Sequence, residues 1–334
     1  SMAWQWDEYA HWHAATCEHT TLKSDYGQHD MVAYDSYEEC SVCKYRIDHS
    51  GNKYIEVFNR TETADGTIFS IGINTRNPES IWYIDFSQIA FPNDVKIIIG
   101  TNAFKDLTNL KIVDFTNLTD SWDVVEIEDN AFLNCSSLKE IVIPAHVTSI
   151  GDLAFSGCLS LESVTFEENS RLKTLDYGVF ANCTSLKSIT LPSGVKELPQ
   201  NLFDGCSALA EVNLPENLTA INAYSFRNCT SLESIVIPDG VTKIDDYAFY
   251  GCTNLKSIVL PDSVTSIGGQ AFRGCTSFES VTFGSQSQLE TIGNYAFAGC
   301  TALSDIVLPD SLTSIGAYAF NGCTALKEII IPDK

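Results

Sequence analysis

The sequence is poor in the features that mark membrane-spanning and nucleic-acid-binding proteins. Its 334 residues contain no stretch close to the roughly 18–20 uncharged apolar residues that a membrane helix needs. Lysine and arginine number 20 against 43 aspartates and glutamates, which gives a formal net charge of −23. Because such an excess of negative charge repels phosphate backbones and anionic headgroups, we expect neither nucleic acid nor an anionic membrane as a partner.

Catalytic signatures are also missing. The sequence has no Gly-x-Ser-x-Gly, no phosphate-binding or dinucleotide-binding glycine pattern and no His-Glu-x-x-His. His146 is the only histidine after residue 50, so a serine or cysteine nucleophile there would lack a histidine base. The sequence therefore predicts a protein that is not an enzyme.

A repeat of 23 or 25 residues organises most of the chain. It is shown cleanly by residues 255–275, LKSIVLPDSVTSIGGQAFRGC. The repeat places a cysteine at each of positions 135, 158, 183, 206, 229, 252, 275, 300 and 323. Strand-like segments begin at Ile81, Leu110, Leu138, Leu161, Leu186, Leu209, Leu232, Leu255, Phe278, Leu303 and Leu326, which predicts about eleven coils.

Each position of the repeat has a structural role. The Leu-x-x-Ile-x-Leu segment has the two-residue period of a strand with one buried face, and a proline often ends it. Ten phenylalanines recur farther on, and we expect them to stack in one buried column: Phe104, Phe132, Phe155, Phe180, Phe203, Phe226, Phe249, Phe272, Phe297 and Phe320. Because one 23-residue coil cannot bury its apolar side alone, residues 81–334 are predicted to form a solenoid.

The unit C-x-x-L-x-x-I-x-[IL]-P-x-x-V-x-x-I-x-x-x-A-F resembles the BspA-like class of bacterial leucine-rich repeats. The resemblance implies a leucine-rich-repeat solenoid, rich in β-strands, with short helical or irregular convex segments. It also implies a bacterial, secreted or surface-displayed adhesin that binds a host or neighbouring-cell surface protein or matrix. The alternative is a structural spacer or targeting module that displays another domain on a bacterial surface.

Two coils depart from the common length. The segments 167–171 (EENSR) and 284–288 (GSQSQ) add two residues each, and both are predicted to bulge from the same edge of the solenoid. Tyr224, Tyr247, Tyr295 and Tyr318 share another repeat position, which is interrupted by Gln270. These tyrosines are predicted either to form a contact patch or to pack beside the phenylalanine column.

The twelve cysteines divide into two groups. The nine repeat cysteines are predicted to be small, buried packing residues rather than disulfides, because they would point in parallel into the core and Leu107 fills the same place in an earlier coil. The other three lie in the Cys/His-rich residues 1–50. We expect a structural zinc site from Cys17, His19, Cys40 and Cys43, with His29 or His13 as a substitute ligand; the alternatives are a disulfide or free thiols.

Residues 51–80 are predicted to form a β-hairpin that covers the N-terminal edge of the solenoid, with its turn at Asp65-Gly66. Ser1-Met2 resembles a cleavage remnant followed by a start codon, so we expect a native leader to have been removed. The chain stops at Lys334 directly after a strand, and we expect the native protein to continue there.

The outward strand positions are the predicted interaction surface. We expect this surface to be concave, polar and mildly acidic, without aromatic anchors, although its positions also include Val236, Val259 and Val307. The predicted contact residues are Lys139, Glu140, Glu162, Thr165, Lys187, Thr190, Glu211, Asn213, Glu233, Lys256, Glu279, Thr282, Asp305 and Lys327.

Overall fold

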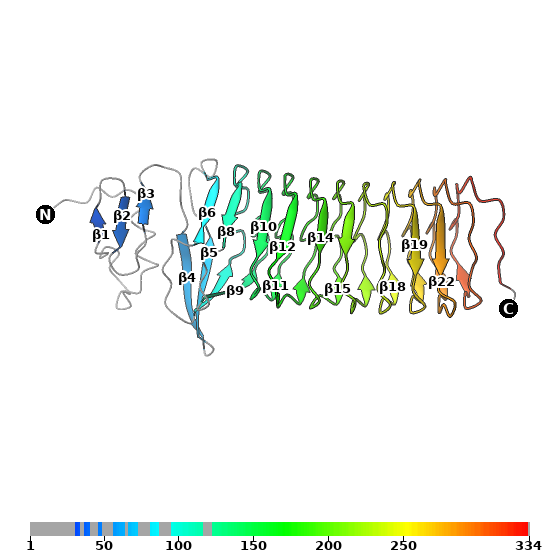
Figure 1. Cartoon of the computed structure of the whole chain (residues 1–334), viewed down its shortest axis with the longest axis horizontal. Helices are drawn as coiled ribbons and strands as arrows, with labels where there is room; N and C mark the ends of the chain where they lie inside the picture. The colour runs from blue at the N-terminus through cyan, green and yellow to red at the C-terminus, as the bar shows by residue number, and fades with distance from the viewer. Residues whose placement is uncertain are drawn as a thin grey trace.

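The computed structural model describes residues 31–33, 37–40, 46–48, 56–63, 66–72, 81–86, 95–115 and 122–332. From residue 81 onward, the described chain winds into successive coils stacked along one axis (Figure 1). Three sides of each coil are hydrogen-bonded to neighbouring coils: two by parallel strands and one by turns. The predicted leucine-rich-repeat solenoid is therefore confirmed, while the count of eleven coils stays a prediction.

The Leu-x-x-Ile-x-Leu segments form the first side, which we call the strand face. Its strands pair in parallel, as in Glu140↔Ser163 and Ser257↔Ser280. The segments that begin at Leu232, Leu303 and Leu326 follow the same path, and isolated bridges such as Val307↔Ile330 connect the last coils. The strands of this face are β6 (Tyr83–Asp85), β8 (Ile112–Asp114), β10 (Glu140–Ile143), β12 (Ser163–Phe166), β14 (Ser188–Thr190), β16 (Glu211–Asn213), β19 (Ser257–Leu260) and β21 (Ser280–Phe283).

The Val-x-x-Ile segments form the second side. They also pair in parallel, in register from coil to coil, as in Ile244↔Ile267 and Ile267↔Ile292. The strands of this side are β7 (Val95–Ile99), β9 (Trp122–Ile127), β11 (Ser149–Ile150), β13 (Thr174–Leu175), β15 (Glu197–Leu198), β17 (Ala220–Ile221), β18 (Lys243–Ile244), β20 (Ser266–Ile267), β22 (Thr291–Ile292) and β23 (Ser314–Ile315).

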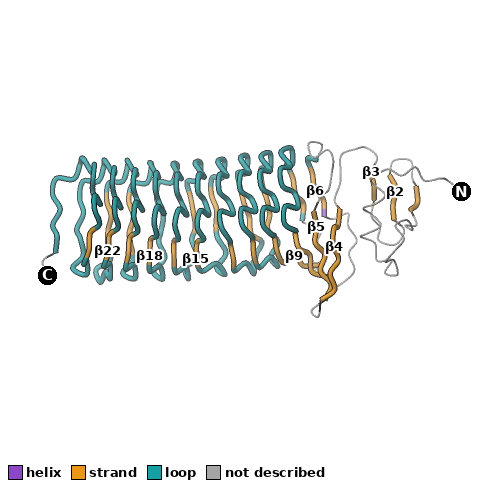
Figure 2. The backbone as a smooth tube through the Cα atoms, turned by 180° about the vertical axis from the view of Figure 1, so that it is seen from behind, coloured by secondary structure: helices purple, strands orange, loops and turns teal. Residues whose placement is uncertain are grey.

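Turns form the third side, which we call the turn edge. Coil-to-coil hydrogen bonds also join this edge, for example from Phe132 N to Ala154 O at 2.7 Å. Each turn contains left-handed residues, such as Tyr247 (φ 57°) and Gly251 (φ 72°), which an α-helix does not tolerate. No α-helix occurs in the described residues, so the convex segments are irregular rather than helical (Figure 2). None of these residues belongs to a helix that could cross a membrane.

The described strands before residue 81 form two antiparallel groups. β1 (Met31–Ala33), β2 (Tyr37–Cys40) and β3 (Arg46–Asp48) make a three-stranded sheet. β4 (Glu56–Thr63) and β5 (Gly66–Gly72) form a hairpin within the range where the sequence predicts one, and β5 pairs in parallel with β7. The hairpin thus extends the sheet of the second side. The division into an N-terminal Cys/His module and a cap stays a prediction.

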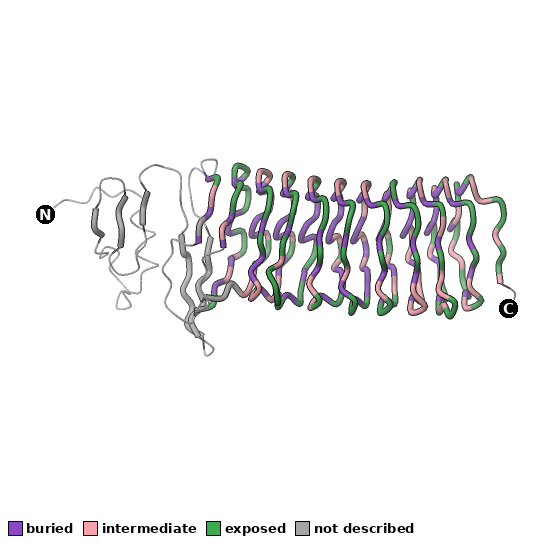
Figure 3. The backbone as a smooth tube through the Cα atoms, viewed as in Figure 1, coloured by how far each residue is buried: buried purple, intermediate pink, exposed green. Residues whose placement is uncertain are grey.

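The core runs the length of the described solenoid (Figure 3). Nine of the ten predicted phenylalanines, Phe104 to Phe297, are fully buried, and Phe320 in the last coil is partly buried. Neighbouring rings stack face to face over most of the column, with centroids 5.1 Å apart for Phe226 and Phe249. The strand spacing of a parallel sheet, about 4.8 Å, is also a favourable ring-stacking distance. One spacing between coils therefore suits both the backbone hydrogen bonds of the sheets and the stacking of the buried rings.

Candidate functional site

The strand face presents three columns of outward side chains, one for each exposed position of the repeat. The strands expose these positions because side chains alternate between the core and solvent, as the burial of β10 and β19 shows. All fourteen predicted contact residues, from Lys139 to Lys327, are exposed on this face. The structure therefore places them on one surface, and their role in binding stays a prediction.

The charged residues of the first column alternate in sign along the solenoid. They are Lys139, Glu162, Lys187, Glu233, Lys256, Glu279 and Lys327, with the uncharged Ala210 and Ser304 at the same position of two other coils. Lys187 Nζ donates a hydrogen bond to Glu162 Oε2 at 2.5 Å, and Lys256 Nζ donates to Glu233 Oε2 at 2.6 Å. These hydrogen bonds lower the pKa of both carboxyl groups. Such exposed pairs add little stability, but they neutralise one another, so the face carries little net charge along this line.

The third column, which we call the aliphatic column, contains Val236, Val259, Val307 and Ile330. Their exposed fractions are 83%, 63%, 76% and 73%. The same position holds Val142, Thr165, Thr190 and Asn213 in the N-terminal coils and Thr282 between Val259 and Val307. Asn213 Nδ2 donates to Thr190 Oγ1 at 3.1 Å. The C-terminal half of the face is therefore less polar than the sequence analysis predicts. Ile330, which the predicted set omits, belongs to this column because it bridges to Val307.

The repeated tyrosines lie on the turn edge. Tyr224 and Tyr247 stack at 4.7 Å, and Tyr295 and Tyr318 stack at 5.0 Å. The guanidinium of Arg227 lies over the Tyr224 ring. All four tyrosines have φ values of 57–61°, in the left-handed region that bulky residues rarely adopt. These rings are half-buried or, for Tyr318, 64% exposed, so they pack mainly on each other and on arginine beside the core.

A partly buried ion pair connects two coils near this edge. Arg227 donates from both Nε and Nη2 to the carboxylate of Asp204, at 2.7 and 2.5 Å. Asp204 is only 7% exposed, so the two-pronged guanidinium compensates for the desolvation of the carboxylate.

The nine repeat cysteines are free and buried, as predicted. Each thiol also donates a hydrogen bond to the carbonyl oxygen of the phenylalanine in the preceding coil, for example Cys252 Sγ to Phe226 O at 3.1 Å. Burial raises the pKa of Cys158 and of Cys252 to about 12. These thiols are therefore structural and poorly reactive.

The predicted zinc ligands cannot be placed together in this structure. Cys17, His19 and Cys43 lie outside the described residues, as do the substitute ligands His13 and His29. Cys40 ends β2, and only its backbone is described. Within the described part of the chain, no group of three or more histidine, cysteine, aspartate or glutamate side chains could hold a metal ion. The zinc site stays a prediction.

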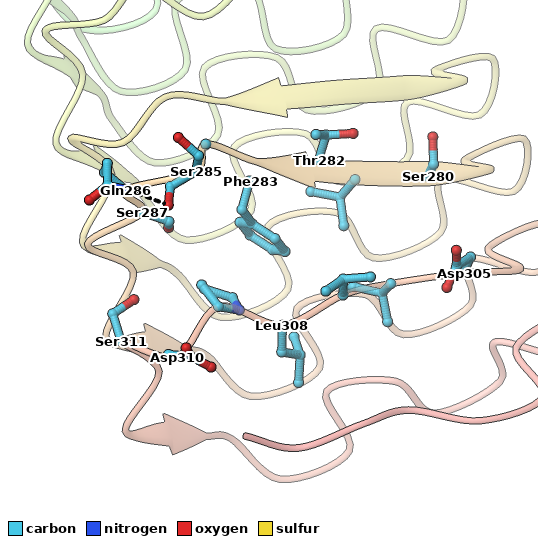
Figure 4. A pocket seen from close by; sticks show the side chains of 15 residues that line it. Ser280, Thr282, Phe283, Ser285, Gln286, Ser287, Asp305, Leu308, Asp310 and Ser311 are labelled. Atoms are coloured by element: carbon cyan, nitrogen blue, oxygen red, sulfur yellow. Dashed lines mark hydrogen bonds between the residues drawn. The ribbon is translucent and has the colours of Figure 1, made fainter. Parts of the chain in front are cut away.

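Two grooves open at the two longer coils. One has a volume of about 550 Å³ and is lined by residues 163–167, 169–170 and 188–193. The other has a volume of about 630 Å³ and is lined by residues 280–287 and 305–311 (Figure 4). The sequence predicts the bulging loops; it gave no signal that each loop would open a groove against the following coil.

Comparison with known proteins supports this architecture. A family model described as "BspA type Leucine rich repeat region" matches in six copies, over residues 35–123, 125–256 and 242–334. Among solved structures, the chain is similar to the pneumococcal vaccine antigen PcpA, with 21% sequence identity over 91% of this chain and 82% of that chain and a TM-score of 0.53. That likeness shows a shared fold.

A leucine-rich repeat protein from Bacteroides ovatus is also similar, at 25% identity over 83% of this chain and 93% of that chain, with a TM-score of 0.41. A leucine rich cell surface protein from Faecalibacterium prausnitzii matches at 22% identity over 90% of this chain and 88% of that chain, with a TM-score of 0.36. No curated protein matches the chain.

Proposed function

This chain belongs to the BspA-type leucine-rich-repeat family, and we propose that it is a non-enzymatic binding protein of a bacterial cell surface. Its partner would be a protein of a host cell, a neighbouring cell or the extracellular matrix. Two facts support display on the surface: the family is of the bacterial surface-antigen type, and the fold is shared with a protein described as a vaccine antigen.

The aliphatic column carries the proposal. Its four branched side chains share one outward position of the strand face, with Thr282 between Val259 and Val307, and each is more than 60% exposed. A row of this kind costs free energy in water and gains it when a partner covers it. The described part of the chain offers no element that covers the column, because the coils form a single stack with turns on the other side (Figure 2). We therefore expect a partner protein to bury these side chains.

The neighbouring columns define the partner further. Ser234, Ser257 and Ser280 run beside the aliphatic column and leave room for close approach. The lysine–glutamate pairs beyond them are neutralised within the column. The chain as a whole is strongly acidic, with a net charge of −23, so we expect a partner with an apolar ridge and a neutral or basic surround.

Substitution of the aliphatic column tests the proposal. The variant V236S/V259S removes two exposed apolar groups without touching the core. It should lose about 2 kcal/mol of binding free energy, roughly 30-fold in affinity, since a buried valine contributes at least about 1 kcal/mol. Binding of wild type and variant to immobilised fibronectin, laminin and type I collagen would be measured by surface plasmon resonance.

Leu159→Ser is the matched control. Leu159 is 47% exposed on the turn edge, and the equivalent position of most other coils holds serine or threonine, such as Ser136 and Thr184. This variant should bind like wild type. If none of the three proteins binds the wild type saturably while segments flanking the solenoid do bind, the alternative function as a structural spacer is favoured. Equal binding of V236S/V259S and wild type would contradict the role of the column.

A further inference from the structure

The two grooves are repeats of one site. The longer coils share a segment that the other coils lack: SVTFEENS at 163–170 and SVTFGSQS at 280–287. In both, a phenylalanine ends the strand where most coils have leucine or isoleucine, and an amide residue follows three positions later; the first two coils also have phenylalanine there, Phe86 and Phe115, but without this following segment. In both, the opposite wall is a Leu-Pro pair, at 191–192 or 308–309. The same site is therefore built twice, five coils apart.

The extra residues create the groove by separating neighbouring strands. β12 pairs with β10 at four positions but with β14 only at Ser163↔Ser188. β21 likewise pairs with β19 at four positions, and only the bridge Ser280↔Asp305 connects it to the next coil. The longer turn carries the end of each strand away from the following coil of ordinary length. Figure 4 shows Phe283 in the space that opens between the two coils.

The phenylalanine presents a partly exposed ring to each groove. At the same strand position, the rings of Phe86 and Phe115 are buried, and so are the aliphatic residues Ile143, Leu191, Leu260 and Leu308; all six are at most 5% exposed. Phe166 and Phe283 are only partly buried and pack at the margin of the core. Each groove therefore presents a partly exposed aromatic ring, whereas the rings at the same position of the first two coils are buried in the core.

Polar groups without positive charge surround this ring. The hydroxyl groups of serine and threonine line both grooves, together with an amide, Asn169 in one and Gln286 in the other. No lysine, arginine or histidine lines either groove, and each contains a carboxylate such as Glu167 or Asp305. This composition disfavours phosphate, sulfate and other anions, which need cationic partners.

Each groove wall is anchored by backbone hydrogen bonds to the coil on its far side. Glu167 N donates to Ile143 O, Gly284 N donates to Leu260 O, and Leu191 N donates to Asn213 O. These bonds hold the two walls in place. The groups available to a ligand between them include the side chains: one aromatic ring with hydroxyl, amide and carboxylate groups around it.

The loop that forms one rim of the second groove is held in place before any ligand arrives. Gln286 N donates to Asp262 Oδ1 at 2.9 Å, and Gln288 N donates to Asp262 O at 2.9 Å. A Cβ atom at Gly284 would lie 2.1 Å from Asp262 Oδ1, so a larger residue there would displace the carboxylate that accepts from Gln286 N. A fixed rim lowers the entropic cost of binding.

We propose that each groove binds a pyranose unit of a neutral glycan, with the sugar's C–H face on Phe166 or Phe283 and its hydroxyl groups on the serine, threonine and amide side chains. A sugar ring has one apolar face and a rim of donors and acceptors, which matches the lining. The two grooves lie about 24 Å apart on one edge, at the spacing of stacked strands. One linear glycan chain could therefore occupy both, which would raise its apparent affinity.

The test uses four soluble neutral polysaccharides as probes: mixed-linkage β-glucan, xylan, mannan and glycogen. Each is cast into a native gel, and retardation of the full chain measures binding. At least one polysaccharide should retard the wild type. The variant F166L/F283L should lose at least tenfold in affinity, and each single variant should lose part of it. Leucine occupies this position in other coils, so the thermal unfolding midpoint of the variants should stay near that of the wild type.

Two controls separate this site from the protein-binding surface. Tyr318→Ala removes an exposed aromatic ring outside both grooves and should be retarded like wild type. V236S/V259S should likewise keep its glycan binding while it loses protein binding. The proposal is overturned if none of the four polysaccharides retards the wild type, or if F166L/F283L is retarded as strongly as the wild type.

Discussion

Truncation of one ring in the middle of the phenylalanine column should weaken the whole solenoid. Phe249 is fully buried, and its ring stacks on Phe226 at 5.1 Å and on Phe272 at 5.2 Å. Phe249→Ala removes both contacts and leaves a cavity that the rigid coil register cannot close. A buried Phe→Ala change typically costs about 3–5 kcal/mol of unfolding free energy, and we expect a loss in this range.

Phe320→Ala is the matched comparison. Phe320 is only partly buried and stacks on a single ring, that of Phe297, at 5.4 Å. Its substitution should cost roughly half as much, about 1–2 kcal/mol, since less apolar surface is removed from water. The contrast between the two positions isolates the contribution of the column from that of any single aromatic residue.

Urea denaturation followed by far-ultraviolet circular dichroism would give the unfolding free energies, and hydrogen exchange would locate the change. Because stability in a repeat protein depends on contacts between neighbouring coils, protection should fall first in the coils on either side of residue 249. A loss below about 1 kcal/mol for Phe249→Ala, or equal losses at both positions, would refute the argument that the stacked column holds the coils together.

Two further predictions concern other buried groups. Burial raises the pKa of Cys158 and Cys252 to about 12 from a usual value of 9, so these thiols stay neutral in the folded chain while they would ionise in the unfolded one. The stability they contribute is complete below pH 9 and is lost as the pH rises toward 12. Unfolding free energies measured at pH 8, 9 and 10 should therefore decline. A thiol reagent at pH 8 should modify the repeat cysteines only as fast as the chain unfolds. A constant free energy up to pH 10, or rapid modification of the native protein, would contradict this view. Arg227→Lys should destabilise the fold by about 1–2 kcal/mol, because a single ammonium cannot reproduce the two-pronged contact with the buried Asp204 carboxylate. Thermal unfolding midpoints of this variant and of the exposed-site variant Lys187→Arg would be compared. Equal midpoints would rule out the proposed role of the ion pair.

The sequence predicts the repeating parts of the fold because periodicity determines which side chains point inward. Spacing alone identifies the strand face, the phenylalanine column and the buried cysteines. It does not reveal that a thiol such as Cys252 donates to the carbonyl of Phe226, since that bond joins residues 26 positions apart through the stacking of two coils. Nor does it reveal that Tyr247 adopts a left-handed conformation, which the register of the turn imposes on an unfavoured residue.

The candidate sites were only partly predictable for a similar reason. The sequence places Val236 and Val259 outward, but only the stacking of the coils brings them into one column with Val307 and Ile330, in which Thr282 is the one polar interruption. The two longer segments are evident as insertions, whereas the grooves depend on how each insertion separates one strand from the next. The predicted zinc ligands Cys17, His19 and Cys43 lie outside the described residues, so that prediction depends on spacing alone.

The most direct test of the proposed binding surface is a hydrogen-exchange footprint of the full chain with the matrix protein that it binds. The column on the strand face predicts slower exchange on binding in residues 232–237 and 257–260, with no change in the turn-edge residues 247–252. Protection confined to the turn edge, with the strand segments unchanged, would contradict the assignment of the strand face as the interaction surface.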